Sequence, residues 1–198
     1  MQQLLAEYDS CAEFYKNGGI TVTGGEPLMQ AEFVAELFSA AKRRGIHTCL
    51  DTSGVTFNPD NAGNIESAIA STDLVMLDIK HIDPVRHKEL TAHGNDNILR
   101  FAQWLSDKRV PMWIRHVVVP GITDDEESLY RLGRFIGALK SVKALDILPY
   151  HDMGVSKYEK LGIDYPLKGV PPADKQQAEA AKAAVMRGIR DERSGKAG

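Results

Sequence analysis

Residues 74–80 read Leu-Val-Met-Leu-Asp-Ile-Lys, an apolar run that ends in charged groups. Apolar side chains at consecutive positions are typical of a strand that is buried on both faces, as in parallel sheets. Similar β-rich runs recur about every 30 residues with helical patterns between them, which is the size of one β-α unit. The expected strands are Ile20–Thr23, Ile46–Leu50, Leu74–Ile79, Met112–Val119 and Ala144–Leu148. The sequence therefore predicts an α/β fold built on a parallel sheet.

Apolar residues spaced three and four apart predict the helices between these strands. The expected helices are Gln2–Lys16, Ala31–Arg44, Ala62–Ala70, Asn97–Lys108, Asp124–Leu139 and Asp174–Arg187. The acidic run Asp124–Glu127 opens one of them, so we interpret it as a helix start with Thr123 and Glu126 as a capping box, not as a metal site. After residue 187 the periodicity is lost, which predicts a single domain over residues 1–187 and a frayed tail over 188–198.

Composition narrows the class of protein. The chain has 198 residues, of which 43% are hydrophobic and 26% charged, and its formal net charge is -3. These values suit one globular domain and give no basic footprint for a nucleic-acid partner. We see no apolar run of the ~18 residues that a membrane span needs, and acidic side chains interrupt residues 1–16, where a secretory signal would be apolar. The expectation is a cytoplasmic protein with no membrane partner.

The two cysteines, Cys11 and Cys49, are too far apart for a C-x-x-C pair and too few for a disulfide scaffold. Three histidines, His81, His87 and His93, recur every six residues, which places them on no common helical face and argues against a zinc site.

Polar groups lie at the ends of the expected strands, or within the run in the case of Met112–Val119, and the carboxyl ends of parallel strands are where ligand sites form. The groups are Thr23-Gly24-Gly25-Glu26, Asp51-Thr52-Ser53-Gly54, Asp78-Ile79-Lys80, Arg115-His116 and Pro149-Tyr150-His151. Each has a structural alternative: a tight turn at Gly24-Gly25, a capped turn at residues 51–54, a buried ion pair of Asp78 with Lys80, and a polar core residue at His151. Their recurrence at every strand end favours a functional site.

The segments 18–28, 45–54, 72–80, 113–121 and 148–151 together resemble the glycyl-radical enzyme activases, a family of radical S-adenosylmethionine (SAM) proteins that includes the activating enzymes of pyruvate formate-lyase. The resemblance runs from about residue 4 to residue 186. It implies a partial parallel (β/α)6 barrel of radical SAM type. It also implies that a 4Fe-4S cluster cleaves SAM reductively, that the resulting radical takes a hydrogen from a glycine of pyruvate formate-lyase or a related enzyme, and that a flavodoxin-type protein supplies the electron.

The resemblance also implies roles for residues, carried over position by position. Gly24, Gly25 and Glu26 would receive the SAM amino group, Asp78, Ile79 and Lys80 would lie along the cofactor, Arg115 would face its carboxylate, and His151 would contact the adenosine. A monovalent cation would bind to Asp51, Thr52, Asp78 and the main-chain oxygen of Met76. Oxygen ligands suit such a hard cation.

One departure from the family pattern concerns the cluster. The family holds it with a C-x-x-x-C-x-x-C loop after the first barrel strand, and three thiolates cannot come from Cys11 and Cys49. We therefore expect a fragment that lacks the first strand and the cluster segment and is inactive alone, with SAM as its own ligand and the cluster present in the complete protein only.

Two other functions remain open from the sequence. The chain could be a cluster-free SAM-binding or regulatory module, which SAM binding without radical chemistry would indicate. It could also be a Schiff-base lyase that uses Lys80, desolvated beside Asp78, as its nucleophile. The second alternative leaves the groups at Gly24–Glu26 and Asp51–Gly54 without a role.

Overall fold

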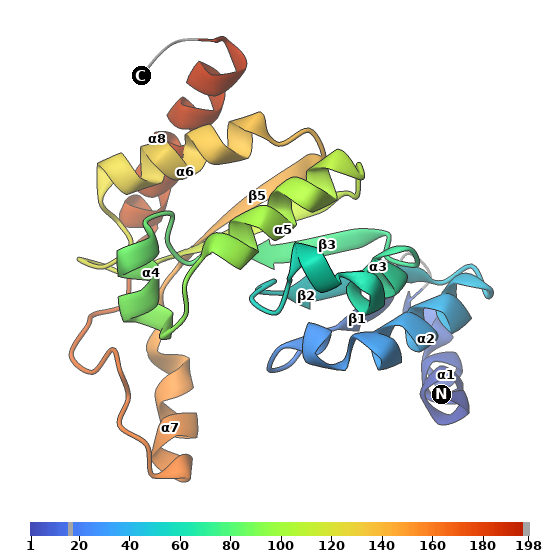
Figure 1. Cartoon of the computed structure of the whole chain (residues 1–198). Coiled ribbons are helices and arrows are strands. Elements are labelled where there is room, and N and C mark those ends of the chain that lie inside the picture. Colours follow the sequence, from blue (N-terminus) through green and yellow to red (C-terminus); the bar gives the residue numbers. More distant parts are fainter. Residues whose placement is uncertain (16–17, 196–198) are drawn as a thin grey trace. The chain divides into compact units, whose positions relative to one another are not determined.

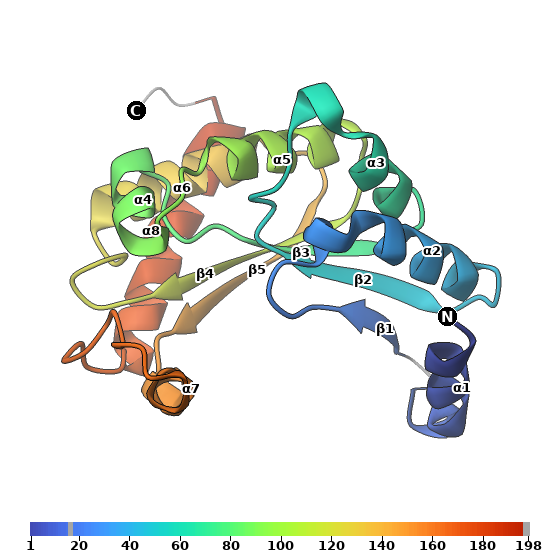
Figure 2. The same cartoon turned by 60° about the horizontal axis from the view of Figure 1, so that its bottom comes forward.

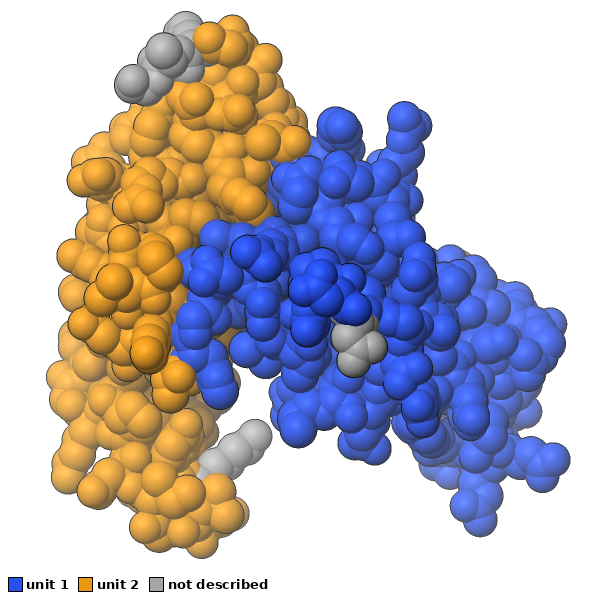
Figure 3. Space-filling model, viewed as in Figure 1, with its two compact units in different colours: residues 1–79, 93–114, 139–145 blue, residues 80–92, 115–138, 146–198 orange. Residues whose placement is uncertain are grey.

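The computed structural model describes residues 1–15 and 18–195. The chain divides into two compact units (Figure 3). Unit 1 comprises residues 1–79, 93–114 and 139–145, and unit 2 comprises residues 80–92, 115–138 and 146–198.

Five strands form one sheet, in the order in which they occur along the chain. They are β1 (Gly19–Val22), β2 (His47–Thr52), β3 (Leu74–Asp78), β4 (Met112–Val118) and β5 (Val142–Pro149). β2 pairs in parallel with β1 and with β3, and the register places Thr21 opposite Cys49 and Asp51 opposite Met76. The five-stranded parallel sheet expected from the sequence is thus confirmed, with strand ends within two residues of the predicted ones.

In unit 1 the sheet has one covered and one open face. Helices α2 (Ala31–Lys42), α3 (Gly63–Ile69) and α5 (Asp96–Asp107) lie on the same face of β1–β3 (Figures 1 and 2). Side chains alternate along a strand, so Leu50, Val75 and Leu77 are fully buried. Their neighbours Asp51 and Met76 face the other way and are only half-buried. Asp51 near the end of β2 therefore lies on the open face, whereas Thr52 at the end of that strand is buried.

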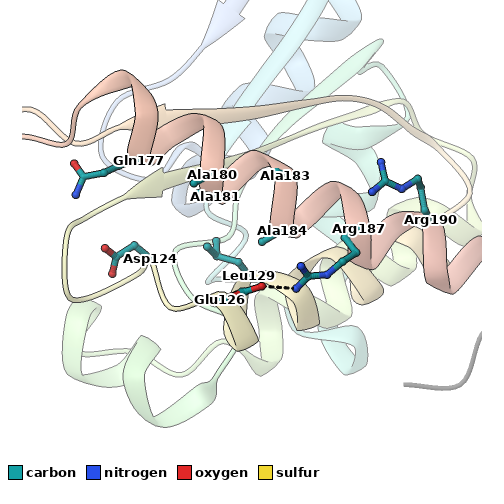
Figure 4. Close-up of a pocket in the computed structure, with 10 residues that line it drawn as sticks. All are labelled: Asp124, Glu126, Leu129, Gln177, Ala180, Ala181, Ala183, Ala184, Arg187 and Arg190. Atoms are coloured by element: carbon teal, nitrogen blue, oxygen red, sulfur yellow. Dashed lines mark hydrogen bonds and ion pairs between the residues drawn. The ribbon is translucent and has the colours of Figure 1, made fainter.

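Unit 2 is organised around α6 (Glu126–Ala138) and α8 (Lys175–Arg193), which lie side by side (Figure 1). Glycines set the close approach: a Cβ on Gly133 would lie 2.1 Å from Val185 O, and one on Gly188 would lie 2.2 Å from Tyr130 O. Polar contacts border this packing, including a hydrogen bond of 2.9 Å from Arg187 Nη2 to Glu126 Oε1 beside a row of alanines on α8 (Figure 4).

The tail predicted at residues 188–198 was wrong over residues 188–193, which continue α8. Gly188 and Ile189 are buried against α6, and this packing holds the helix where its sequence becomes highly charged. Residues 196–198 lie outside the described residues, and the single domain stays a prediction. At the other end, Lys16 of the predicted first helix is likewise not described; the described part forms α1 (Gln2–Ser10) and a 3-10 turn (Ala12–Tyr15).

The predicted capping box at the start of α6 was also wrong. Thr123 Oγ1 donates to Val117 O at 2.7 Å and accepts from Val119 N at 2.8 Å, so it is engaged in the preceding loop. Asp125 caps the helix instead, because its Oδ1 accepts from Ser128 N at 2.9 Å. Among the α-helices of the described residues, α4 (Pro84–Thr91) and α7 (Val155–Leu161) were not predicted.

Within the described residues, the structure contains no helix with the length and apolar character that crossing a membrane requires.

The glycine contact between α6 and α8 predicts a stability effect. Gly188→Ala should lower the free energy of unfolding by about 3 kcal/mol, because the added methyl group would overlap the backbone of α6 and force the helices apart. Urea denaturation would measure it. Gly154→Ala is the matched control in unit 2, since nothing lies within 4 Å of its Cβ position. Equal stability of the two variants would contradict this account of the packing.

Candidate functional site

The loop after β1 presents accessible backbone. Gly24 and Gly25 are exposed, and a Cβ at either position would meet nothing within 4 Å. Gly24 has φ +129°, a conformation that only glycine adopts readily. The loop can therefore offer main-chain donors and acceptors to a ligand without obstruction from side chains.

Glu26 fixes this loop to the end of β2. Its Oε1 accepts hydrogen bonds from Leu28 N at 3.0 Å and from Thr52 Oγ1 at 2.5 Å. Its Oε2 accepts from Ser53 N at 3.0 Å and from Ser53 Oγ at 2.6 Å. An ionised carboxylate has about four lone-pair sites, so these four donors satisfy it. Glu26 thus acts as a clamp between two strand ends, a role that its placement in the sequence did not show.

Asp51 lies on the open face beside Met76 and Asp78. Its Oδ2 accepts from Thr23 Oγ1 at 3.2 Å, and the strand register places it opposite Met76. Asp78 follows Met76 by two positions and shares its face. Of the four residues predicted for the cation, the side chains of these three therefore face the same side of the sheet in unit 1.

The fourth, Thr52, differs. Its side chain is buried, donates to Glu26 and accepts from Gly54 N at 2.9 Å. Its hydroxyl is therefore used in the clamp. Among the described residues no group of three or more His, Cys, Asp or Glu side chains could hold a metal ion.

The other predicted cofactor residues lie after β3 and β5 and, in the case of Arg115, in the middle of β4. Ile79 is fully buried after β3, at the end of unit 1. Lys80, Arg115 and His151 belong to unit 2. Lys80 and Arg115 are half-buried, whereas His151 is exposed after β5.

His81 anchors the segment that follows Lys80. Its ring is 1% exposed, and Nδ1 accepts from Asp83 N at 3.0 Å while Nε2 lies 3.6 Å from Asp125 Oδ2. Burial lowers the pKa of His81; the carboxylates of Asp125 and Asp83 oppose this, and Arg86 and His116 reinforce it.

Asp83 also caps α4, accepting from Val85 N and Arg86 N, with Pro84 at the first helical position. The Asp-Pro pair was the sequence signal for this helix.

A 4Fe-4S cluster does not fit the cysteines of this chain. Cys49 is buried in β2, and Cys11 is half-buried directly after α1. A cluster that leaves one iron open for a ligand needs three thiolates, and two in these positions cannot supply them.

Comparison with known proteins identifies the class. The family model described as the Radical SAM superfamily matches residues 1–133, and the chain belongs to this superfamily. It is 51% identical over 167 residues to the pyruvate formate-lyase-activating enzyme of Streptococcus mutans, covering 83% of this chain and 64% of that protein. It is 49% identical over 166 residues to that of Staphylococcus epidermidis, covering 83% and 66%. The chain thus spans slightly less than two thirds of the length of these relatives.

Solved structures share the fold of this chain. A domain of the pyruvate-formate lyase-activating enzyme of Bacteroides vulgatus matches with a TM-score of 0.69 and 20% identity, over 89% of this chain and 95% of that domain. SuiB of Streptococcus suis, bound to its precursor peptide SuiA, matches with a TM-score of 0.58 and 18% identity, over 83% of this chain and 35% of SuiB. The fold class and the resemblance expected from the sequence are confirmed.

Because Glu26 accepts every hydrogen bond of the clamp, Glu26→Gln should destabilise the protein by about 2 kcal/mol. The amide nitrogen that replaces one carboxylate oxygen is a donor, and it would face groups that also donate. Urea denaturation together with amide exchange at Ser53 would measure the loss. Glu36→Gln, at an exposed position of α2, is the control. A Glu26→Gln protein as stable and as protected as the wild type would contradict the clamp.

Burial of His81 predicts a pH dependence of stability. The pKa of His81 in the folded protein lies below the ordinary value of about 6.5, so below that pH the unfolded chain binds more protons than the folded protein does. The stability that neutral His81 contributes to the folded state is fully present above about pH 6.5. It is lost as the pH falls towards the lowered pKa of the folded state. His81→Asn keeps an acceptor for Asp83 N, and should reduce the slope of unfolding free energy between pH 5 and 6.5. The exposed control His47→Asn should leave the slope in place; equal slopes in all three proteins would be the contrary result.

Proposed function

We propose that this chain forms the SAM-binding part of a glycyl-radical enzyme activase, whose substrate is pyruvate formate-lyase or a related enzyme. One observation carries the proposal: half of the aligned residues are shared with relatives that bear the name of pyruvate formate-lyase-activating enzymes. The open backbone of Gly24 and Gly25, held in place by Glu26, supports a ligand site at the same point.

The roles of the residues in this proposal follow the family pattern. The main chain of Gly24 and Gly25 receives the SAM amino group, and Glu26 positions that loop through its contacts with β2. Asp78, Ile79 and Lys80 lie along the cofactor, Arg115 faces the SAM carboxylate, and His151 contacts the adenosine. A monovalent cation is proposed at Asp51, Asp78 and the main-chain oxygen of Met76; because the Thr52 hydroxyl serves the clamp, its backbone oxygen is the ligand that it has left to contribute.

Radical chemistry is assigned to the complete protein and not to this chain. The two cysteines do not supply the thiolates of the cluster, so the chain alone is proposed to bind SAM without cleaving it. A flavodoxin-type electron donor and a cytoplasmic location belong to the same proposal.

SAM binding tests the proposed site. The chain should bind SAM in isothermal titration calorimetry, and Gly24→Ala should weaken binding at least tenfold, because a side chain there disfavours φ +129° and projects into the open space of the loop. Gly94→Ala is the control, an exposed glycine of unit 1 whose Cβ would also meet nothing within 4 Å. Failure of the wild-type chain to bind SAM, or equal binding by both variants, would contradict the site.

Two further measurements separate this proposal from its alternatives. Anaerobic treatment with iron and sulfide should give no stoichiometric 4Fe-4S cluster on this chain, and a complete cluster would overturn the assignment of inactivity.

In the complete protein, Asp51→Ala should abolish or strongly reduce glycyl-radical formation while Asp124→Ala does not. If the complete protein binds SAM but forms no glycyl radical, a SAM-binding regulatory module is the better description. Borohydride trapping of a carbonyl compound on Lys80 would instead indicate a Schiff-base lyase.

A further inference from the structure

Unit 2 contains a pocket that is lined largely by α7 (Val155–Leu161) and by the segment after it. In Figure 1 this segment returns beside α7. The volume of the pocket is about 450 Å³, and Tyr150, Tyr158 and Tyr165 line it. Tyr150 immediately precedes His151, so the pocket adjoins a residue of the proposed SAM site along the chain. Nothing in the proposed function uses it.

The tyrosines form a fixed aromatic wall. Tyr150 and Tyr165 share a hydrogen bond of 2.9 Å between their hydroxyl groups, and the ring centroids of Tyr158 and Tyr165 lie 5.0 Å apart at 76°. The hydrogen bond to Tyr150, together with burial, raises the pKa of Tyr165 to about 12, so its phenol stays neutral at physiological pH. Such rings offer electron-rich faces, which attract ammonium and guanidinium groups.

The charged side chains that line the pocket are mostly of the matching sign. Three exposed carboxylates, those of Asp152, Glu159 and Asp164, line it together with one basic side chain, Lys168. An excess of acidic groups around an aromatic wall complements a cation and opposes an anion.

The same segment of the chain carries exposed apolar side chains, one of which, Ile163, lines the pocket. Met153 is 73% exposed, Leu161 71% and Ile163 55%. A small free cation would leave these surfaces in water, whereas a polypeptide that inserts one side chain could cover them with its neighbouring residues. The surroundings therefore favour a polypeptide as the source of the cation.

We propose that this pocket binds a lysine or arginine side chain of the polypeptide on which the complete protein acts. The inference rests on the proposed function for the identity of that polypeptide. Binding of the side chain itself needs neither SAM nor the cluster, because every residue invoked belongs to residues 150–168.

Binding can be tested on the chain by calorimetry with the peptide acetyl-Gly-Leu-Lys-Leu-Gly-amide and its norleucine analogue. The lysine peptide should bind at least tenfold more tightly, and added salt should weaken it. Glu159→Gln/Asp164→Asn should reduce its affinity about tenfold without changing the fold, because both positions are exposed. The control Glu89→Gln/Glu127→Gln removes two exposed charges of unit 2 outside the pocket. Tyr158→Leu should weaken the lysine peptide and leave the norleucine peptide unchanged.

Three results would overturn the inference: no binding of the lysine peptide, equal binding of the norleucine peptide, or equal loss in the control variant. If N-α-acetyl-lysine amide binds as tightly as the lysine peptide, the pocket accepts small cations and the polypeptide assignment is contradicted. In the complete protein, Glu159→Gln/Asp164→Asn should raise KM for the polypeptide substrate and leave SAM cleavage in its absence unchanged. Absence of radical formation in the wild type would refute the proposed function only, whereas radical formation with an unchanged KM would refute this inference only.

Discussion

Alternation of side chains along β3 is the constraint on which unit 1 depends. Val75 and Leu77 are fully buried on the helix-covered face, so Met76 and Asp78 are directed to the open face. A shift of the register by one residue would place an acidic side chain in the core and expose two large apolar ones. The packing of the core and the position of the proposed ligand groups are therefore set by the same choice of register.

This constraint explains how much the sequence could predict. Apolar runs that end in polar groups locate parallel strands, and they predicted all five strands and the places of Asp51 and Asp78 at the ends of two of them. They did not predict that these two side chains lie on an open face, because the same runs indicated strands buried on both faces. The clamp was not predictable in this way, because Ser53 contributes a backbone N–H and a hydroxyl to a carboxylate 27 positions earlier in the chain. Which polar groups satisfy one another depends on how loops meet, and hydrophobic periodicity carries no information about that.

The errors at helix ends have the same origin. Thr123 and Glu126 have the spacing of a capping box, but Thr123 bonds to Val117 and Val119 in the loop before the helix, which leaves the cap to Asp125. The last helix continues through a charged sequence because Gly188 allows its backbone to reach α6. Local propensity decides such a segment only where no tertiary contact competes with it.

The proposed binding site is physically separable from the chemistry of the family. Glu26, Thr52 and Ser53 satisfy one another within unit 1, and the open conformation of Gly24 follows from the backbone that this clamp fixes. None of these contacts uses a thiolate or a metal ion. Because the clamp forms from residues of the chain itself, the loop that would receive SAM is organised before any ligand arrives, and the entropy cost of ordering it on binding is correspondingly reduced. The proposed SAM affinity of this chain can therefore be measured apart from catalysis, because none of the contacts that organise the loop depends on the cysteines of the cluster.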